Sequence, residues 1–260
     1  MDQKLVLQNT SIVVTRPSQQ NHNICNQLKK FGATPIAFPC IEICPNPAAD
    51  LAKIKQTIQR SHMLIFISNN AVNFAFKLFP TLIKELPQDC IIAAVGSSTA
   101  RVLQRYGVKK VLTPEHSPDS EQLLKHVDLQ QVKQKVILII KGIGGRELLY
   151  ETLHNRGADV HNIELYERTL PELVDITPLN NKIDLILFTS NETVKNFLEL
   201  TSGSLQESLL TCQTIVGHQR IAEKVSSLGF KKLPIIAATP SDADMLAAVL
   251  QWRRDNQAHN

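Results

Sequence analysis

Six short segments of this sequence hold most of the side chains that could bind an anion. Each follows an apolar run and opens a helical pattern, and they occupy residues 15–18, 68–70, 96–99, 141–146, 190–192 and 217–220. A helix N-terminus presents N–H groups without intrahelical partners and carries a partial positive charge. The six segments therefore predict binding of a ligand with several carboxylates or phosphates.

The candidate ligand-binding residues are small or have hydroxyl, amide or basic side chains. They are Arg16, Ser68, Asn69, Asn70, Ser97, Thr99, Lys141, Gly144, Arg146, Ser190 and Arg220. For each hydroxyl or amide the alternative is N-capping of the helix, which needs no ligand. Their shared position after strands, rather than any one residue, favours a binding site.

Other chemistries find little support in the residue pattern. Segment 141–146 contains GxGG, but it lacks the third glycine of a dinucleotide fingerprint and the GK[ST] of a phosphate loop, so no nucleotide cofactor is predicted. Cys40 and Cys44 have no His or Cys cluster nearby, so no metal site is predicted. Tyr166 is the candidate weak acid, and the alternative is a tyrosine that only packs in a connector.

Short apolar, β-branched runs alternate with helical patterns along the chain. The helical patterns stop at Gly32, Gly107 and Gly157, and the apolar runs lie at residues 12–14, 63–67, 91–95, 136–140, 183–188, 214–216 and 234–237. Continuous apolar runs indicate strands buried on both faces, and glycine is common just after a helix. The alternation predicts an α/β fold with parallel sheets.

The chain also repeats itself. Residues 66–72 return as 188–194, displaced by 122 positions, and Val95-Gly96 returns as Val216-Gly217 before a second helix. The turn after Gly217 then reads as one residue longer than its twin. The repeat predicts two similar lobes, and a cleft between lobes is a common ligand site.

Two extended segments interrupt the alternation, at residues 38–45 and 163–169. Each follows a strand that begins near a Gly-Ala pair, and each precedes a new helical stretch. We expect them to connect the lobes and to pair with each other as two strands.

The composition is ordinary for a globular domain pair. The chain has 260 residues, 43% of them hydrophobic and 20% charged, with a formal net charge of +4. Apolar runs of five or six residues are too short to span a membrane, and no secretory signal is visible, so a cytoplasmic protein is expected. Aromatic content of 5% and lysine pairs at helix ends argue against nucleic-acid binding.

Taken together, the turns resemble the uroporphyrinogen-III synthase family. The similar motifs follow one another in order over nearly the whole chain, at residues 14–17, 66–72, 94–100, 119–124, 141–146, 166–168 and 188–190. The resemblance implies a lyase of porphyrin and heme biosynthesis that needs no cofactor. Such an enzyme cyclises hydroxymethylbilane, a linear tetrapyrrole with eight carboxylates, to uroporphyrinogen III, losing water and inverting ring D through a spiro intermediate.

The resemblance also implies a particular architecture. Two flavodoxin-like lobes with parallel sheets are joined by a two-stranded antiparallel β ladder. One lobe comprises residues 1–37 with 172–260 and the other residues 40–168, with connectors at about 38–45 and 163–171. A monomer that binds neither membrane nor nucleic acid is expected.

The family's catalytic tyrosine corresponds to Tyr166, which would protonate or orient the leaving hydroxyl group. A threonine common in the family's C-terminal lobe is missing here, because Arg220 or Ile221 falls in its place. The alternative function is a non-catalytic, two-lobed binding protein for a small polyanionic ligand, which needs the repeat and the cleft but not Tyr166.

Overall fold

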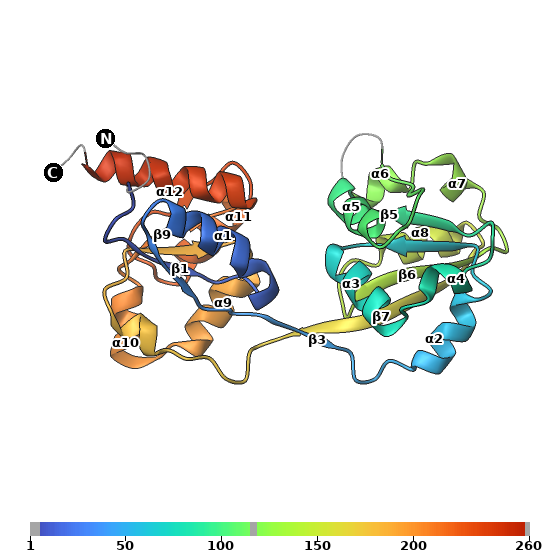
Figure 1. Cartoon of the computed structure of the whole chain (residues 1–260), viewed down its shortest axis with the longest axis horizontal. Helices are drawn as coiled ribbons and strands as arrows, with labels where there is room; N and C mark the ends of the chain where they lie inside the picture. Colours follow the sequence, from blue (N-terminus) through green and yellow to red (C-terminus); the bar gives the residue numbers. More distant parts are fainter. Residues whose placement is uncertain (1–5, 115–118, 258–260) are drawn as a thin grey trace. The chain divides into compact units, whose positions relative to one another are not determined.

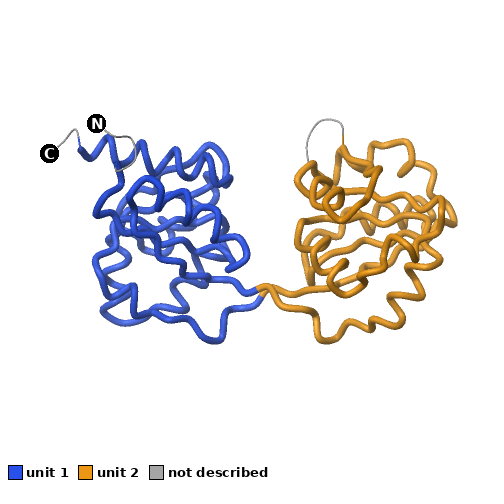
Figure 2. The backbone as a smooth tube through the Cα atoms, viewed as in Figure 1, with its two compact units in different colours: residues 1–42, 169–260 blue, residues 43–168 orange. Residues whose placement is uncertain are grey.

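The computed structural model describes residues 6–114 and 119–257 (Figure 1). It divides into two compact units, shown in two colours in Figure 2. Unit 1 comprises residues 1–42 and 169–260, and unit 2 comprises residues 43–168. Each unit contains its own five-stranded sheet covered by helices, so the α/β prediction is confirmed.

Unit 1 is built on the strand order β10-β9-β8-β1-β2, and all four neighbouring pairs are parallel. Numbered within the unit, this order is 2-1-3-4-5, that of flavodoxin-like sheets. The strands are β1 (Ser11–Val14), β2 (Thr34–Ala37), β8 (Leu185–Phe188), β9 (Gln213–Val216) and β10 (Ile235–Ile236). The helices are α1 (Ser18–Lys30), the 3-10 helix η2 (Thr177–Asn180), α9 (Asn191–Leu200), α10 (Gly203–Leu209), α11 (Gln219–Ser227) and α12 (Asp242–Gln257).

The sheet of unit 1 is buried on both faces, which explains its continuous apolar strands. Ile12 and Val14 of β1 face a core formed with α1 and α12, whereas Val13 faces a core formed with α9 and α11. Alternation along one strand therefore places successive apolar side chains in two different cores.

Unit 2 has the strand order β3-β7-β6-β4-β5. The pairs β7-β6, β6-β4 and β4-β5 are parallel, and β3 adds the antiparallel edge pair with β7. The strands are β3 (Glu42–Pro45), β4 (Met63–Phe66), β5 (Ile91–Ala94), β6 (Val136–Gly142) and β7 (Asp159–Thr169). The helices are α2 (Leu51–Ile58), α3 (Asn69–Leu78), α4 (Leu82–Glu85), α5 (Ser97–Arg105), α6 (Ser120–Leu123), α7 (Val127–Gln130) and α8 (Leu148–Asn155).

The strands of the two sheets pair in the same register. The two halves of the sheet, however, come in opposite order along the sequence in the two units. In unit 1 Ser11 pairs with Thr34, and in unit 2 the pair 125 positions later, Val136 and Asp159, is its counterpart. The pair β8-β9 matches β4-β5 with a displacement of 122 positions. Each sheet therefore combines the first half of one sequence repeat with the second half of the other, and the units are circular permutants of each other.

This register corrects the alignment of one turn. The helix caps show that Gly96 corresponds to His218, not to Gly217, because each precedes the first helical residue with nearly the same extended φ and ψ. The two turns are equally long, so the prediction of a longer second turn is wrong. Gly217 is a glycine for another reason, since a Cβ there would lie 2.6 Å from Pro240 Cβ.

The second expected connector is part of a longer strand. Residues 159–169 form β7 without interruption, where the sequence suggested a strand followed by a separate connector. The strand carries an irregularity opposite the end of β6, because Lys141 pairs with Glu164 but Gly142 pairs with Tyr166. The extra residue, Leu165, is a β-bulge, a feature that re-aims the next side chain.

Candidate functional site

Ser68 lies where β4 gives way to α3. Its backbone is extended, with φ of −160°, and its hydroxyl accepts a hydrogen bond from the N–H of Ala71 at 3.1 Å. This satisfies one of the N–H groups left without a partner at the start of α3. The capping alternative considered for Ser68 is therefore real, but the cap leaves the hydroxyl with further hydrogen-bonding capacity.

Tyr166 uses that capacity. Its phenolic oxygen lies 2.9 Å from Ser68 Oγ, and its ring stacks on Phe74 of α3 with centroids 5.3 Å apart and planes 23° apart. The ring also lies against Gly142, where an added Cβ would be 2.5 Å from Tyr166 Cε2. Only glycine fits at the end of β6 beneath this ring.

The β-bulge in β7 turns Tyr166 into this position. Lys141 pairs with Glu164 but Gly142 pairs with Tyr166, so Leu165 is the extra residue and Tyr166 takes the place opposite Gly142. Leu165 and Tyr166 are both buried, at 1% and 2% exposed. The backbone around them is held by two further bonds: Asn46 N–H donates to Leu165 O at 3.0 Å, and Ile143 N–H donates to Tyr166 O at 2.8 Å.

The first turns of α3 and α5 join beside Ser68. The Asn69 side-chain amide donates to Ser98 Oγ at 3.0 Å. Ser97 is exposed and Asn70 is half-buried, whereas Thr99 is buried. The structure thus brings Ser68, Asn69, Ser97 and Tyr166 to the carboxyl-end edge of the parallel strands in unit 2, the edge where α/β sheets bind ligands.

Lys141 belongs to the opposite face of the same sheet. It precedes Gly142 in β6, and successive strand residues point to opposite faces. Its side chain is 2% exposed and its Nζ lies 2.7 Å from Glu147 Oε1, while Asn162 Nδ2 donates to Glu147 Oε2 at 2.9 Å. The pKa of the Glu147 carboxyl group is lowered mainly by the hydrogen bond from Lys141 and, second, by the one from Asn162.

Lys141 thus differs from the sequence-based expectation. It was expected in a turn with an available charge, but it lies inside a strand and its ammonium is matched by a carboxylate. A buried charge requires such a partner because burial removes it from water. Lys141 and Arg146 line a cavity of about 150 Å³ whose other lining residues include Ser120, Tyr150 and Asn162.

The glycine-rich turn after β6 is exposed. Gly144 has a φ of 77°, in the left-handed region that favours glycine. The Arg146 side chain is 84% exposed and reaches Glu121 Oε1 at 3.5 Å. An ion pair this exposed contributes little to stability, so the Arg146 guanidinium remains available to another anion.

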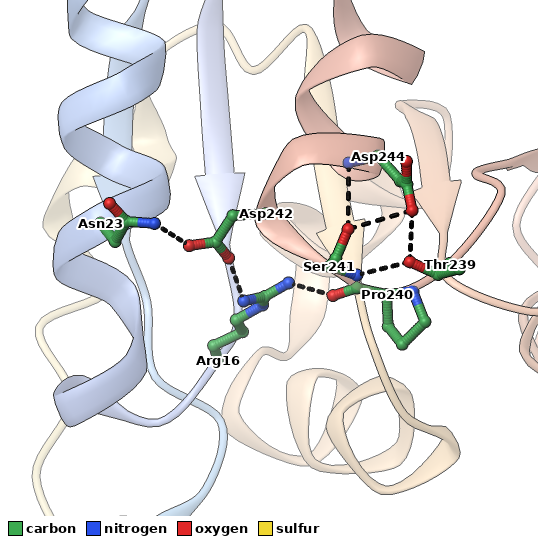
Figure 3. A network of polar contacts seen from close by, with 7 residues as sticks. All are labelled: Arg16, Asn23, Thr239, Pro240, Ser241, Asp242 and Asp244. Carbon is green, nitrogen blue, oxygen red and sulfur yellow. Dashed lines mark hydrogen bonds and ion pairs between the residues drawn. The ribbon is translucent and has the colours of Figure 1, made fainter. Parts of the chain in front are cut away.

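Arg16 of unit 1 is held in a network of polar contacts (Figure 3). Its guanidinium donates to Asp242 at the start of α12 and to the carbonyl oxygen of Pro240, and the Asn23 amide donates to the same carboxylate. The Arg16 side chain is 13% exposed. The sequence predicts that the Arg16 charge binds a ligand, but, like Lys141, Arg16 is paired with a carboxylate of its own unit.

Ser190 and Arg220 complete the candidates of unit 1. Ser190 caps α9, accepting from Thr193 N–H at 3.1 Å as part of a capping box. Arg220 is exposed in the first turn of α11. Because Gly96 corresponds to His218, Arg220 corresponds to Ser98 and Ile221 corresponds to Thr99. Ile221 and Thr99 are both buried. Ile221 therefore occupies the position at which the family threonine was sought.

Sequence reasoning missed several residues that build the site. Phe74 and Glu147 have no motif that marks them, and Asp242 lies far along the chain from Arg16. Gly142 had a signal, since a glycine at a strand end often marks a bulge or a close approach.

No group of three or more His, Cys, Asp or Glu side chains in residues 6–114 and 119–257 is placed to hold a metal ion. None of the helices described is both long and apolar enough to cross a membrane.

Known proteins resemble this chain both in sequence and in fold. A uroporphyrinogen-III synthase from Escherichia coli is 30% identical over 247 residues, covering 93% of this chain and 100% of the relative, and one from Salmonella typhimurium matches to the same extent. Among solved structures, the synthetase from Helicobacter pylori superposes with a TM-score of 0.63 at 20% identity, covering 94% of this chain and 99% of the other.

A mutant uroporphyrinogen III synthase from Thermus thermophilus gives a TM-score of 0.56 at 16% identity, covering 96% and 99% of the two chains. At these identities the structural likeness supports the fold alone. The family model described as uroporphyrinogen-III synthase HemD matches residues 23–247. With relatives matched over their entire length, this places the chain in the uroporphyrinogen-III synthase family.

Proposed function

We propose that this chain converts hydroxymethylbilane to uroporphyrinogen III, with loss of water and inversion of ring D. The observation that carries the proposal is the match of the whole chain to relatives named as this synthase. The reaction is a step of tetrapyrrole biosynthesis. A non-catalytic binding protein is not favoured, because the named relatives are enzymes.

The side chains at the edge of the unit 2 sheet suit such a substrate. Its carboxylates would meet the N-termini of α3 and α5, where Asn69, Asn70, Ser97 and the N–H groups of the first turns lie. Arg146 would add an exposed positive charge. In unit 1, Ser190 and Arg220 would play the same part at the starts of α9 and α11.

Tyr166 is the proposed acid. The hydroxymethyl group leaves as water only if its oxygen receives a proton, and the phenolic O–H of a tyrosine can donate one. The remaining work is positional: the enzyme must hold ring D so that the inverted closure is faster than simple closure. Binding through backbone N–H groups would make many single side-chain deletions mild.

The test is an isomer assay. The purified chain is incubated with hydroxymethylbilane without added metal or nucleotide, and the oxidised products are separated into type I and type III isomers. We expect the type III isomer in excess at a rate above spontaneous closure. Type I product alone, at the spontaneous rate, would refute the proposal.

We also propose that the protein acts as a monomer in the cytoplasm, without a cofactor, a membrane or a nucleic acid. Light scattering coupled to size-exclusion chromatography should give one chain of about the 29.0 kDa sequence mass. Dialysis against a chelator should leave the isomer assay unchanged. A dimer, or activity that returns only with added metal, would contradict this part.

A further inference from the structure

The hydroxyl group of Tyr166 is buried within unit 2. The residue is 2% exposed, and its ring contacts Gly142 and Phe74 while its oxygen contacts Ser68. All of these partners lie in the same unit. In this conformation the phenol is therefore screened from any ligand that approaches from outside.

Ser68 is half-buried, so it is more accessible than the tyrosine. A serine hydroxyl has one proton to donate and two lone pairs that accept. One lone pair accepts the Ala71 N–H at 3.1 Å, and the other is within 2.9 Å of the Tyr166 phenol. Either hydroxyl group could be the donor in this contact. When Tyr166 donates, both lone pairs of Ser68 are occupied and the serine's own proton is free to point outward.

The corresponding serine of unit 1 shows that capping does not require this arrangement. Ser190 caps α9, and its described side-chain hydrogen bonds all involve Thr193. Ser68 makes the same cap and in addition contacts a tyrosine hydroxyl 98 positions away in the sequence. The second contact therefore calls for a role beyond starting a helix.

We propose that Ser68 relays the proton of Tyr166 to the leaving hydroxyl group of the substrate, an inference that rests on the function proposed above. The C–O bond of the hydroxymethyl group breaks and its electron pair stays on oxygen. The Ser68 proton joins that oxygen to form water, while the Tyr166 proton moves to Ser68 Oγ. The pyrrole nitrogen supplies the electrons for the new exocyclic C=C bond.

The same path restores the enzyme. In the spiro route the substituted α carbon of ring D bonds first to the exocyclic carbon, and the bond from that α carbon to its methylene bridge then breaks. The bridge forms a new C–C bond to the free α carbon of ring D, which loses its proton, and this proton returns through Ser68 to the Tyr166 phenolate. The sum of the two steps is one substrate converted to one product and one water, with both hydroxyl groups regenerated. Ser68 is then the residue that touches the substrate, and Tyr166 acts through it.

The first experiment is a double-mutant cycle on kcat and KM with hydroxymethylbilane. Ser68→Ala and Tyr166→Phe should each lower kcat about a hundredfold, the low end of general acid catalysis. The double variant should be no slower than the slower single variant, because the two groups act as one unit. Ser68→Thr, which keeps a hydroxyl, should retain most of kcat.

The matched control is Asp50→Ala. Asp50 caps α2 by accepting from Lys53 N–H at 3.0 Å, so this variant loses a similar cap in the same unit. We expect its kcat to be unchanged. If Asp50→Ala lowers kcat as much as Ser68→Ala does, loss of stability explains both and the relay is wrong.

The second experiment is a proton inventory in mixtures of H₂O and D₂O. Transfer of two protons together should make kcat of the unmodified protein curve with deuterium content, and Ser68→Ala should give a straight line. A straight line for the unmodified protein would overturn the relay. So would a double variant whose loss of kcat equals the product of the two single losses. If the unmodified protein makes the type III isomer but Ser68→Ala keeps full kcat, the relay fails while the proposed function stands.

Discussion

The Tyr166 ring rests on Gly142, and no larger residue fits at that position. A Cβ on Gly142 would lie 2.5 Å from Cε2 and 2.7 Å from Cζ of the ring. The contact joins the end of β6 to the bulge in β7, and it fixes the ring next to Phe74 and Ser68.

Gly142→Ala should therefore displace the tyrosine ring. We expect a loss of about 1–3 kcal/mol in the free energy of unfolding, the usual cost of overpacking. Urea denaturation measures it. In a Tyr166→Ala background the same substitution should cost close to nothing, because the ring is gone. An equal cost in both backgrounds would show that Gly142 is required for a different reason.

The pair of Lys141 and Glu147 predicts a pH dependence of stability. The folded state lowers the pKa of Glu147, mainly through the hydrogen bond from Lys141. A carboxyl group with a lowered folded pKa adds stability above its unfolded pKa, near 4.3, and this stability is lost as the pH falls through the folded pKa.

Glu147→Gln should thus lower the unfolding free energy at pH 7 by about 1 kcal/mol or less, because the Glu147 side chain is 43% exposed and water screens its ion pair with Lys141. The difference from the unmodified protein should shrink below pH 4 in thermal melts. Glu151→Gln, at an exposed position on α8, serves as the control and should change little. A difference that stays constant from pH 7 to pH 3 would argue against this ion pair.

The contacts of Arg16 and Asp242 predict strong coupling in unit 1. Their side chains are 13% and 19% exposed, so a cycle of Arg16→Ala and Asp242→Ala should give a coupling energy of about 0.5–3 kcal/mol. The exposed pair Arg146 and Glu121 is the comparison and should couple by about 0–1 kcal/mol. Equal coupling in the two cycles would contradict the importance of burial here.

The exchange of halves between the units predicts how fragments behave. Residues 43–168 contain all that unit 2 needs and should fold alone, with dispersed amide signals in NMR spectra. Residues 169–260 lack β1, which lies between β8 and β2 in the sheet, and should stay unfolded until residues 1–42 are added. A folded 169–260 fragment would show that β1 is dispensable.

Local pattern was sufficient for most of the elements and for the family. The buried run 136–140 appears as β6, and Ser68 and Ser190 appear at the starts of α3 and α9. These features depend on neighbours in the chain, through hydrophobic periodicity and helix capping. The family resemblance, which rested on the order of short motifs, is confirmed by the comparisons.

The partners of the charged side chains could not be predicted from the sequence. Arg16 and Lys141 looked alike as cations beside a ligand site, yet each is paired with a carboxylate inside its unit. Asp242 lies 226 positions from Arg16, and only folding brings them together. A sequence shows that a charge exists but not what screens it.

The sequence by itself determined most of the strands and helix starts, the repeat and the family, because these are encoded by residues near one another or by motif order. Only the tertiary structure decided which half-repeats share a sheet, that Gly96 corresponds to His218, and that a bulge turns Tyr166 onto Gly142 and toward Ser68. Strand register shifts by single residues, and a shift of one residue reverses which face a side chain occupies, so the site depends on pairings between distant segments.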